Sequence, residues 1–233
     1  YIDFSGCDMQ LGGSALAQSM GLLGDKAPGV KSADYFANAF NAVQALVENK
    51  QLLAAHDISA GGLLTTVLEM TFANTKGGMH INLHDIAGDD VVKMLMAENP
   101  GVVVQISDDH KQEFKEFMDE AGVSFAKIGY PTPKERTITV KAGDYKHEFD
   151  IDKLRDVWYK TSYLLDRDQS MNGCAAERYN NYKEEKLEMK FNKDFTGKLE
   201  QYGISADRRT ASGVKAAIIR EKGTNGEREM AYS

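Results

Sequence analysis

This sequence has little cysteine, no long apolar run and no excess of positive charge. Its two cysteines, Cys7 and Cys174, form neither a CxxC pair nor a cluster with histidine. We therefore expect neither a disulfide framework nor a zinc site, and a reducing cytoplasm is the simple location to expect. No apolar run approaches the roughly 20 residues of a membrane-spanning helix, so we expect no membrane partner.

Basic residues are outnumbered by acidic ones, with 28 Lys and Arg against 35 Asp and Glu in 233 residues. This balance argues against nonspecific nucleic-acid binding, which needs a basic surface, although a local basic patch stays compatible with it. The length fits one large domain, or one domain with attached segments. The chain opens at Tyr1 in a strand-like pattern, without an initiator Met or a signal peptide, so we expect a fragment.

The most informative stretch is residues 53–73, with the sequence LAAHDISAGGLLTTVLEMTFA. An apolar start is broken at HDIS, two glycines follow, and apolar residues then recur at helical spacing. This order predicts a strand or loop, a glycine turn and a helix. Gly61 and Gly62 allow a backbone to come close to a ligand, and the helix start presents free N–H groups and a positive dipole end. These glycines can therefore bring a phosphate or another ligand close to the helix start.

An acid and a hydroxyl precede this glycine turn. Asp57 can hold Mg²⁺, and Ser59 can donate to a nucleotide phosphate or cap the helix. Ordinary N-capping and turn chemistry explain the same residues, and the sequence leaves both interpretations open. His56 is likewise either an acid/base or phosphate donor, or a structural hydrogen-bonding residue at the turn.

Gly12, Gly13 and Ser14 form a second glycine turn before a short apolar helix. Its backbone N–H groups can receive an anion, so we place these three residues near a phosphate. A plain N-cap at Ser14 is the alternative.

The order of the predicted elements indicates one α/β half-domain over residues 1–168, with a small mixed sheet and helices packed on one side. Residues 102–106 are nearly all apolar, which predicts a central strand. Residues 125–130 form a predicted strand that ends at Pro131. A helix is predicted over 151–168.

The pattern changes after residue 168. Residues 169–212 are polar and short of large apolar side chains, which predicts an extended connector without its own core. Within 213–233 a strand is predicted at 214–220 and a helix start at 227–231. We expect this last segment to be the truncated start of a new domain.

Three motifs together carry a resemblance to a known family. LGGSALAQ (11–18), and HDISAGGLL (56–64) with Glu69-Met70, resemble the second C-terminal half-domain of the phosphoribosylformylglycinamidine synthases. These are large, single-chain amidotransferases of purine biosynthesis. AIIREKGTNGEREM (217–230) resembles the opening of their glutaminase domain. The resemblance covers essentially the whole chain.

The resemblance implies a fold similar to the C-terminal domain of aminoimidazole ribonucleotide synthetase. It implies a ligase that converts formylglycinamide ribonucleotide, ATP and glutamine to formylglycinamidine ribonucleotide, ADP, phosphate and glutamate. ATP activates the amide oxygen as an iminophosphate, and channelled ammonia displaces phosphate. A second nucleotide site in such enzymes holds ADP and Mg²⁺ structurally. Asp57 matches the family's Mg²⁺-binding Asp, and Ser59 its nucleotide-contacting Ser. The resemblance thus implies that Ser59, Gly61 and Gly62 bind the nucleotide.

The family pattern also limits what this chain contributes. It implies no catalytic residue here, since the glutaminase nucleophile lies beyond Ser233, and neither Cys7 nor Cys174 is a candidate for it. Many relatives carry Asp where this chain has Ala60. The tract FDIDKL (149–154) also departs from the family pattern, so no substrate role is carried onto it.

The implied partners are the preceding synthetase half-domains and the following glutaminase domain of the same polypeptide, together with a nucleotide. Self-association of the isolated piece is expected, because removing its neighbours exposes apolar surface. Two alternatives remain: a non-catalytic scaffold module, and a stand-alone ATPase like aminoimidazole ribonucleotide synthetase or the hydrogenase-maturation enzymes. The segment after Val214 argues against the second.

Overall fold

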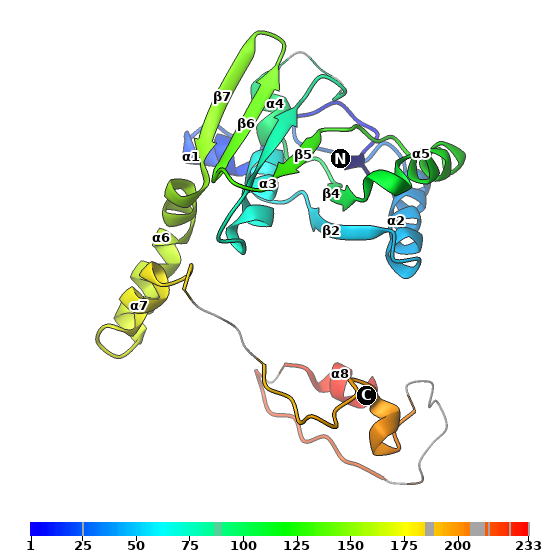
Figure 1. Cartoon of the computed structure of the whole chain (residues 1–233), viewed down its shortest axis with the longest axis vertical. Coiled ribbons are helices and arrows are strands. Elements are labelled where there is room, and N and C mark those ends of the chain that lie inside the picture. The colour runs from blue at the N-terminus through cyan, green and yellow to red at the C-terminus, as the bar shows by residue number, and fades with distance from the viewer. Residues whose placement is uncertain are drawn as a thin grey trace. The chain divides into compact units, whose positions relative to one another are not determined.

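The computed structural model describes residues 1–24, 26–86, 88, 90–184, 189–205, 213, 215–223 and 225–232 (Figure 1). Contacts divide the chain into two compact units, Tyr1–Glu185 and Lys186–Ser233. Across the described residues, no helix has both the length and the apolar character needed to cross a membrane.

The first sheet of the larger unit is antiparallel and has three strands. Strand β4 (Gly101–Ile106) lies between β1 (Ile2–Asp3) and β2 (Leu52–Asp57). The central position predicted for 102–106 is therefore confirmed. Register pairs His56 with Val103, which fixes the end of β2 beside the middle of a buried strand.

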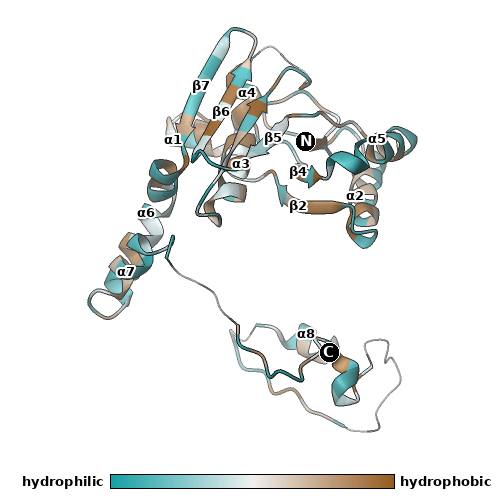
Figure 2. Ribbon diagram, in the orientation of Figure 1, coloured by the Kyte–Doolittle hydropathy of each residue, from teal (hydrophilic) through white to brown (hydrophobic). Residues whose placement is uncertain are grey.

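The second sheet is mixed and has the order β5-β3-β6-β7. Strand β3 (Gly78–Asn82) runs parallel to β6 (Thr137–Ala142) and antiparallel to β5 (Gly129–Thr132), and β7 (Tyr145–Asp150) closes a hairpin with β6. The α/β class with a mixed sheet is thus confirmed, with the strands divided between two sheets. Figure 2 shows β7 as hydrophilic along most of its length, as expected for an exposed edge strand.

One strand boundary differs from the sequence prediction. The strand predicted over 125–130 instead begins at Gly129 and continues through Pro131. Strand β5 is an edge strand, where the N–H that proline lacks is not needed for pairing on both sides. Phe125 forms only an isolated bridge with Ile2.

Eight α-helices are present in the described residues, and four of them begin at a side-chain cap. Ser32 accepts from the N–H of Tyr35, and Asp150 accepts from the N–H of Lys153. The helices are α1 (Ala15–Ser19), α2 (Ala33–Glu48), α3 (Gly62–Phe72), α4 (Val91–Met96), α5 (Lys111–Glu120), α6 (Ile151–Gln169), α7 (Cys174–Asn180) and α8 (Glu227–Tyr232).

Two clusters of buried side chains form the core. One joins α3 and α4 to the strands β3 and β6 through Val67, Leu95, Ile81 and Val140, among others. The other joins α2 and α5 to the first sheet, with Leu46 and Met118 fully buried. The helical spacing of apolar residues in 63–72 therefore places α3 against both the second sheet and α4, and this fixes where the preceding turn lies.

The smaller unit holds a short 3₁₀ turn (Leu199–Tyr202) and α8. Rings of Phe191 and Phe195 stack at 4.9 Å between centroids. The strand predicted at 214–220 is wrong for the described residues 215–220, which form no strand; Val214 lies outside the described residues. A strand needs a partner to pair with, and none of the described residues of this unit supplies one.

Candidate functional site

The predicted strand, glycine turn and helix are present. Strand β2 ends at Asp57, and α3 begins at Gly62 after a four-residue turn. Gly61 and Gly62 have φ values of +88° and +66°, which place both in the left-handed region that favours glycine. Thr66 on α3 donates its hydroxyl to the Asp57 carbonyl at 3.1 Å, so the first turn of the helix is fastened to the end of the strand.

Asp57 and Ser59 do not cap this helix. The N-cap position is Gly61, and no side chain accepts a hydrogen bond from the helix start in the manner of a cap. The capping interpretation of these two residues is therefore wrong. The Asp57 side chain is 77% exposed, and His56 Nδ1 lies 3.4 Å from its Oδ1. Its carboxylate oxygens consequently face solvent at the edge of the first sheet.

His56 connects the turn to two helices. Its Nδ1 lies 2.9 Å from the Asp57 carbonyl oxygen, and its Nε2 lies 3.0 Å from Glu69 Oε2 on α3. The other Glu69 oxygen accepts from Trp158 Nε1 on α6 at 2.8 Å. Both ring nitrogens thus lie within hydrogen-bond distance of an oxygen of the protein, which agrees with the structural role offered for His56 by the sequence.

The second glycine turn is closed by its own chain. Gly12 donates its N–H to the Lys26 carbonyl at 2.8 Å, and Gly13 donates to the Leu23 carbonyl at 2.7 Å. Ser14, which is buried, accepts from the Ala17 N–H at 3.2 Å. The N-cap alternative for Ser14 is confirmed.

Glu98 links the two glycine turns. Its Oε1 accepts from the Gly61 N–H and from the Ala15 N–H, each at 2.8 Å. The neighbouring Asn99 is 1% exposed and donates to Ser5 Oγ and to the Asp8 carbonyl, each at 3.2 Å. Sequence reasoning missed Glu98, because its partners lie 37 and 83 positions away along the chain and no local pattern marks them.

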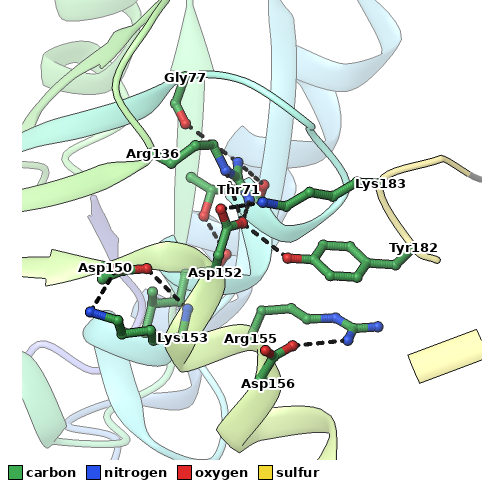
Figure 3. A network of polar contacts seen from close by, with 11 residues as sticks. Thr71, Gly77, Arg136, Asp150, Asp152, Lys153, Arg155, Asp156, Tyr182 and Lys183 are labelled. Atoms are coloured by element: carbon green, nitrogen blue, oxygen red, sulfur yellow. Dashed lines mark hydrogen bonds and ion pairs between the residues drawn. The ribbon is translucent and has the colours of Figure 1, made fainter. Parts of the chain in front are cut away.

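A third polar cluster surrounds Asp152 at the start of α6 (Figure 3). Arg136 donates to its Oδ1 at 2.9 Å, Tyr182 donates to the same oxygen at 3.0 Å, and Lys183 pairs with its Oδ2. Partial burial favours the neutral carboxyl, but these three donors outweigh burial and lower the Asp152 pKa to about 2. Arg136 also donates to the Thr71 carbonyl at 3.2 Å, so this cluster ties the end of α3 to α6.

Arg155, also on α6, joins this helix to α7. Its side chain is 7% exposed, donates to the Tyr179 carbonyl at 2.7 Å, and lies 3.7 Å from the centre of the Tyr182 ring. Such cation–π contacts stabilise a guanidinium that is buried away from solvent. The contacts of this cluster join the end of α3, the start of α6 and the segment around Tyr179 to Lys183.

Two further observations concern metals and thiols. In the part of the chain that the structure describes, no group of three or more His, Cys, Asp and Glu side chains gathers in a way that could hold a metal ion. Cys7 and Cys174 are free cysteines, the first exposed and the second half-buried.

The sequence is similar to a known domain family and to much longer proteins. The family model "AIR synthase related protein, C-terminal domain" matches residues 5–141. The "Probable phosphoribosylformylglycinamidine synthase, chloroplastic/mitochondrial" of Arabidopsis thaliana is 36% identical and covers 99% of this chain, and the Homo sapiens phosphoribosylformylglycinamidine synthase is 32% identical with the same coverage. The chain spans 16% and 17% of these two relatives.

A partial likeness to solved structures accompanies these matches. "T. maritima PurL complexed with FGAR" has a TM-score of 0.47 and 21% identity, and the match covers 59% of this chain and 24% of that one. The family assignment rests on the sequence matches rather than on this superposition.

Proposed function

Because this chain belongs to the AIR synthase related family, through its C-terminal domain over residues 5–141, we propose that it is one module of a phosphoribosylformylglycinamidine synthase. The whole enzyme would be an ATP-dependent carbon–nitrogen ligase that takes nitrogen from glutamine. This module would supply the nucleotide-facing and Mg²⁺-facing turn after β2 together with scaffold, and would be inactive alone. Residues 1–168 would form the half-domain, 169–212 a connector, and 213–233 the start of the glutaminase domain.

The observation that carries the proposal is the exposed Asp57 carboxylate, which has no capping role. Mg²⁺ prefers oxygen ligands and usually takes one or two carboxylates, with water and substrate phosphates filling the other positions. A single exposed Asp at the end of a strand fits that requirement, and Ser59 beside it adds a hydroxyl donor. When bound, the ion would neutralise phosphate charge, and Asp57 would fix its position.

Gly61 and Gly62 would shape the turn so that a nucleotide comes close to it. Gly12, Gly13 and Ser14 would lie near the phosphates through their link to the same turn by Glu98. The two free cysteines support a reducing compartment, and we propose the cytoplasm. One plant relative is named chloroplastic/mitochondrial.

Removing the Asp57 carboxylate is expected to abolish nucleotide retention without loss of the fold. In Asp57→Ala the free energy of unfolding should change by less than about 0.5 kcal/mol, because the side chain is exposed and caps nothing. The complete polypeptide would be purified without added nucleotide and denatured, and the supernatant would be chromatographed. About one ADP per chain is expected in the parent and none in the variant.

Asp109→Ala is the matched control, since Asp109 is also exposed but lies at the start of the 3₁₀ turn before α5. It should retain the parent's nucleotide. ADP retained by Asp57→Ala would refute a ligand role for Asp57, and a parent without ADP would refute the structural nucleotide.

One surface feature supports the proposed partners within the same polypeptide. Helix α6 extends away from both sheets (Figure 1), and its apolar side chains Val157, Trp158 and Leu165 are 68%, 50% and 61% exposed. These three residues leave an apolar stripe on one helix, within which Trp158 also packs against Phe72 and donates to Glu69 of the larger unit. The same exposed stripe supports a second candidate function, in which the chain is a non-catalytic scaffold that docks neighbouring domains.

The stripe is expected to make the 233-residue chain self-associate. Sedimentation velocity over a hundredfold concentration range should show dimers or larger species that Val157→Ser with Leu165→Ser reduces. Val92→Ser is the control, because Val92 is 50% exposed on α4, outside the stripe. A parent chain that stays monomeric at every concentration would contradict this expectation.

A further inference from the structure

We propose that Glu98 is an internal anion that takes the place of a phosphate at the start of α3, so that a nucleotide meets this turn through Asp57 with its cation and through the Ser59 hydroxyl. This rests on the proposed function and deepens it, by naming the groups through which the ligand is received. Glu98 is then a positioning residue, since it acts on the ligand through the turn.

The first argument is the occupancy of the helix start. The N–H of Gly61 precedes the first residue of α3, where the helix dipole favours negative charge. Glu98 Oε1 accepts from it at 2.8 Å, and the same oxygen accepts from Ala15 at 2.8 Å. A carboxylate on two backbone N–H groups provides the charge and the hydrogen bonds that an incoming phosphate oxygen would offer.

The second argument is that the N–H groups of all four glycines in the two turns are used. Gly62 donates to the Ser59 carbonyl at 3.0 Å, and Gly12 and Gly13 donate to carbonyls of residues 26 and 23. The exposed polar side chains of the turn after β2 are those of Asp57 and Ser59. A phosphate repels a bare carboxylate, so its approach from this side requires a divalent cation between them.

The third argument is that Glu98 is held in place from both sides along the chain. Asn99 is buried and fastened to Ser5 and Asp8, each at 3.2 Å. On the other side, Gly62 packs so tightly on the backbone of residues 95–97 that an added Cβ would lie 2.7 Å from the nearest atom, the Met96 carbonyl carbon. The backbone on either side of Glu98 is therefore held in place, which limits where its carboxylate can lie.

The test uses backbone amide resonances of the ¹⁵N-labelled chain, with inorganic phosphate as the probe. In the parent, the Gly61 and Ala15 amides should not respond to phosphate up to tens of millimolar. In Glu98→Ala both amides should exchange with solvent at least tenfold faster. Phosphate should then shift both with one saturation curve and restore their protection, which a merely structural residue would not produce.

Glu98→Gln is the matched variant, since its side-chain oxygen can still accept from both N–H groups while its charge is lost. It should keep the fold and exclude phosphate. A phosphate-dependent shift of the Gly61 amide in the parent would by itself overturn the proposal. The proposal would also be overturned if Glu98→Ala folds and phosphate restores the exchange protection of neither amide.

Measuring the ADP that each variant retains, with Mg²⁺ present, distinguishes failure of this inference from failure of the proposed function. In the complete polypeptide, loss of bound ADP in Asp57→Ala with retention in Glu98→Gln is the expected result. If Glu98→Gln loses ADP as fully as Asp57→Ala, the inference fails while the proposed function stands. If the parent holds no ADP, the proposed function fails, and the phosphate result in the labelled chain still decides whether Glu98 is the internal anion.

Discussion

Gly62→Ala is expected to lower the free energy of unfolding by about 3 kcal/mol or more, because the first residue of α3 has no room for a side chain. An added Cβ would lie 2.7 Å from the Met96 carbonyl carbon and 2.8 Å from the carbonyl oxygens of Leu95 and Ala97. All three are backbone atoms, so no rotamer change relieves the clash. The residue also has a φ of +66°, which costs about 1 kcal/mol for an L side chain.

The variant should report more than a generic loss of stability. Moving α3 away from α4 separates the Gly61 N–H from Glu98, so protection of that amide should fall before the second sheet unfolds. Urea unfolding followed by far-UV circular dichroism gives the free energy, and hydrogen exchange gives the order of events.

Gly143→Ala is the matched control, because it separates backbone conformation from contact. Gly143 also has a positive φ, +57°, but an added Cβ there meets nothing within 4 Å. Its cost should be about 1 kcal/mol, the conformational part alone. Equal losses in the two variants would show that the contact with residues 95–97 contributes nothing.

The turn after β2 could be predicted from the sequence because its signals are local. Two adjacent glycines, an acid before them and apolar residues at helical spacing after them determine a strand, a turn and a helix within about 20 residues. The sequence could not decide whether Asp57 caps that helix. The answer depends on the left-handed conformation of Gly61, which moves the N-cap away from the acid.

The contacts that organise the site could not be predicted, because they join distant segments. Glu98 reaches Ala15 across 83 positions, and Arg136 reaches Thr71 across 65. The division into two sheets was missed for the same reason, since strand alternation gives no information on which strands pair. For β5, the sequence predicts an end at Pro131, whereas the strand continues through it. An edge strand tolerates proline, and the sequence does not mark which strands lie at an edge.

Asp152→Asn is expected to lower the free energy of unfolding by about 2 kcal/mol at pH 7, and this loss should disappear in acid. The carboxylate is 28% exposed and accepts from Arg136 and Tyr182 while pairing with Lys183. These contacts lower its pKa from 3.8 to about 2 despite partial burial. A shift of this size corresponds to about 2 kcal/mol of preference for the ionised carboxylate in the folded state.

The sign of the pH dependence follows from the direction of the shift. A carboxyl whose pKa is lower in the folded state adds its full stability above the unfolded value, near pH 4, and loses it as the pH falls toward 2. The parent should therefore lose stability between about pH 4 and pH 2 through this residue. Asp152→Asn carries no such charge, so the gap between the two proteins should close over that interval.

Urea unfolding at pH 7, 4 and 2.5 measures this gap, and the single tryptophan, Trp158 on the same helix, supplies a fluorescence signal close to the cluster. Asp144→Asn is the control, because Asp144 is exposed in the turn between β6 and β7. Its effect on the free energy of unfolding should be small. A gap for Asp152→Asn that stays constant from pH 7 to pH 2.5 would mean that shape and hydrogen bonding, rather than charge, hold α6 to the end of α3.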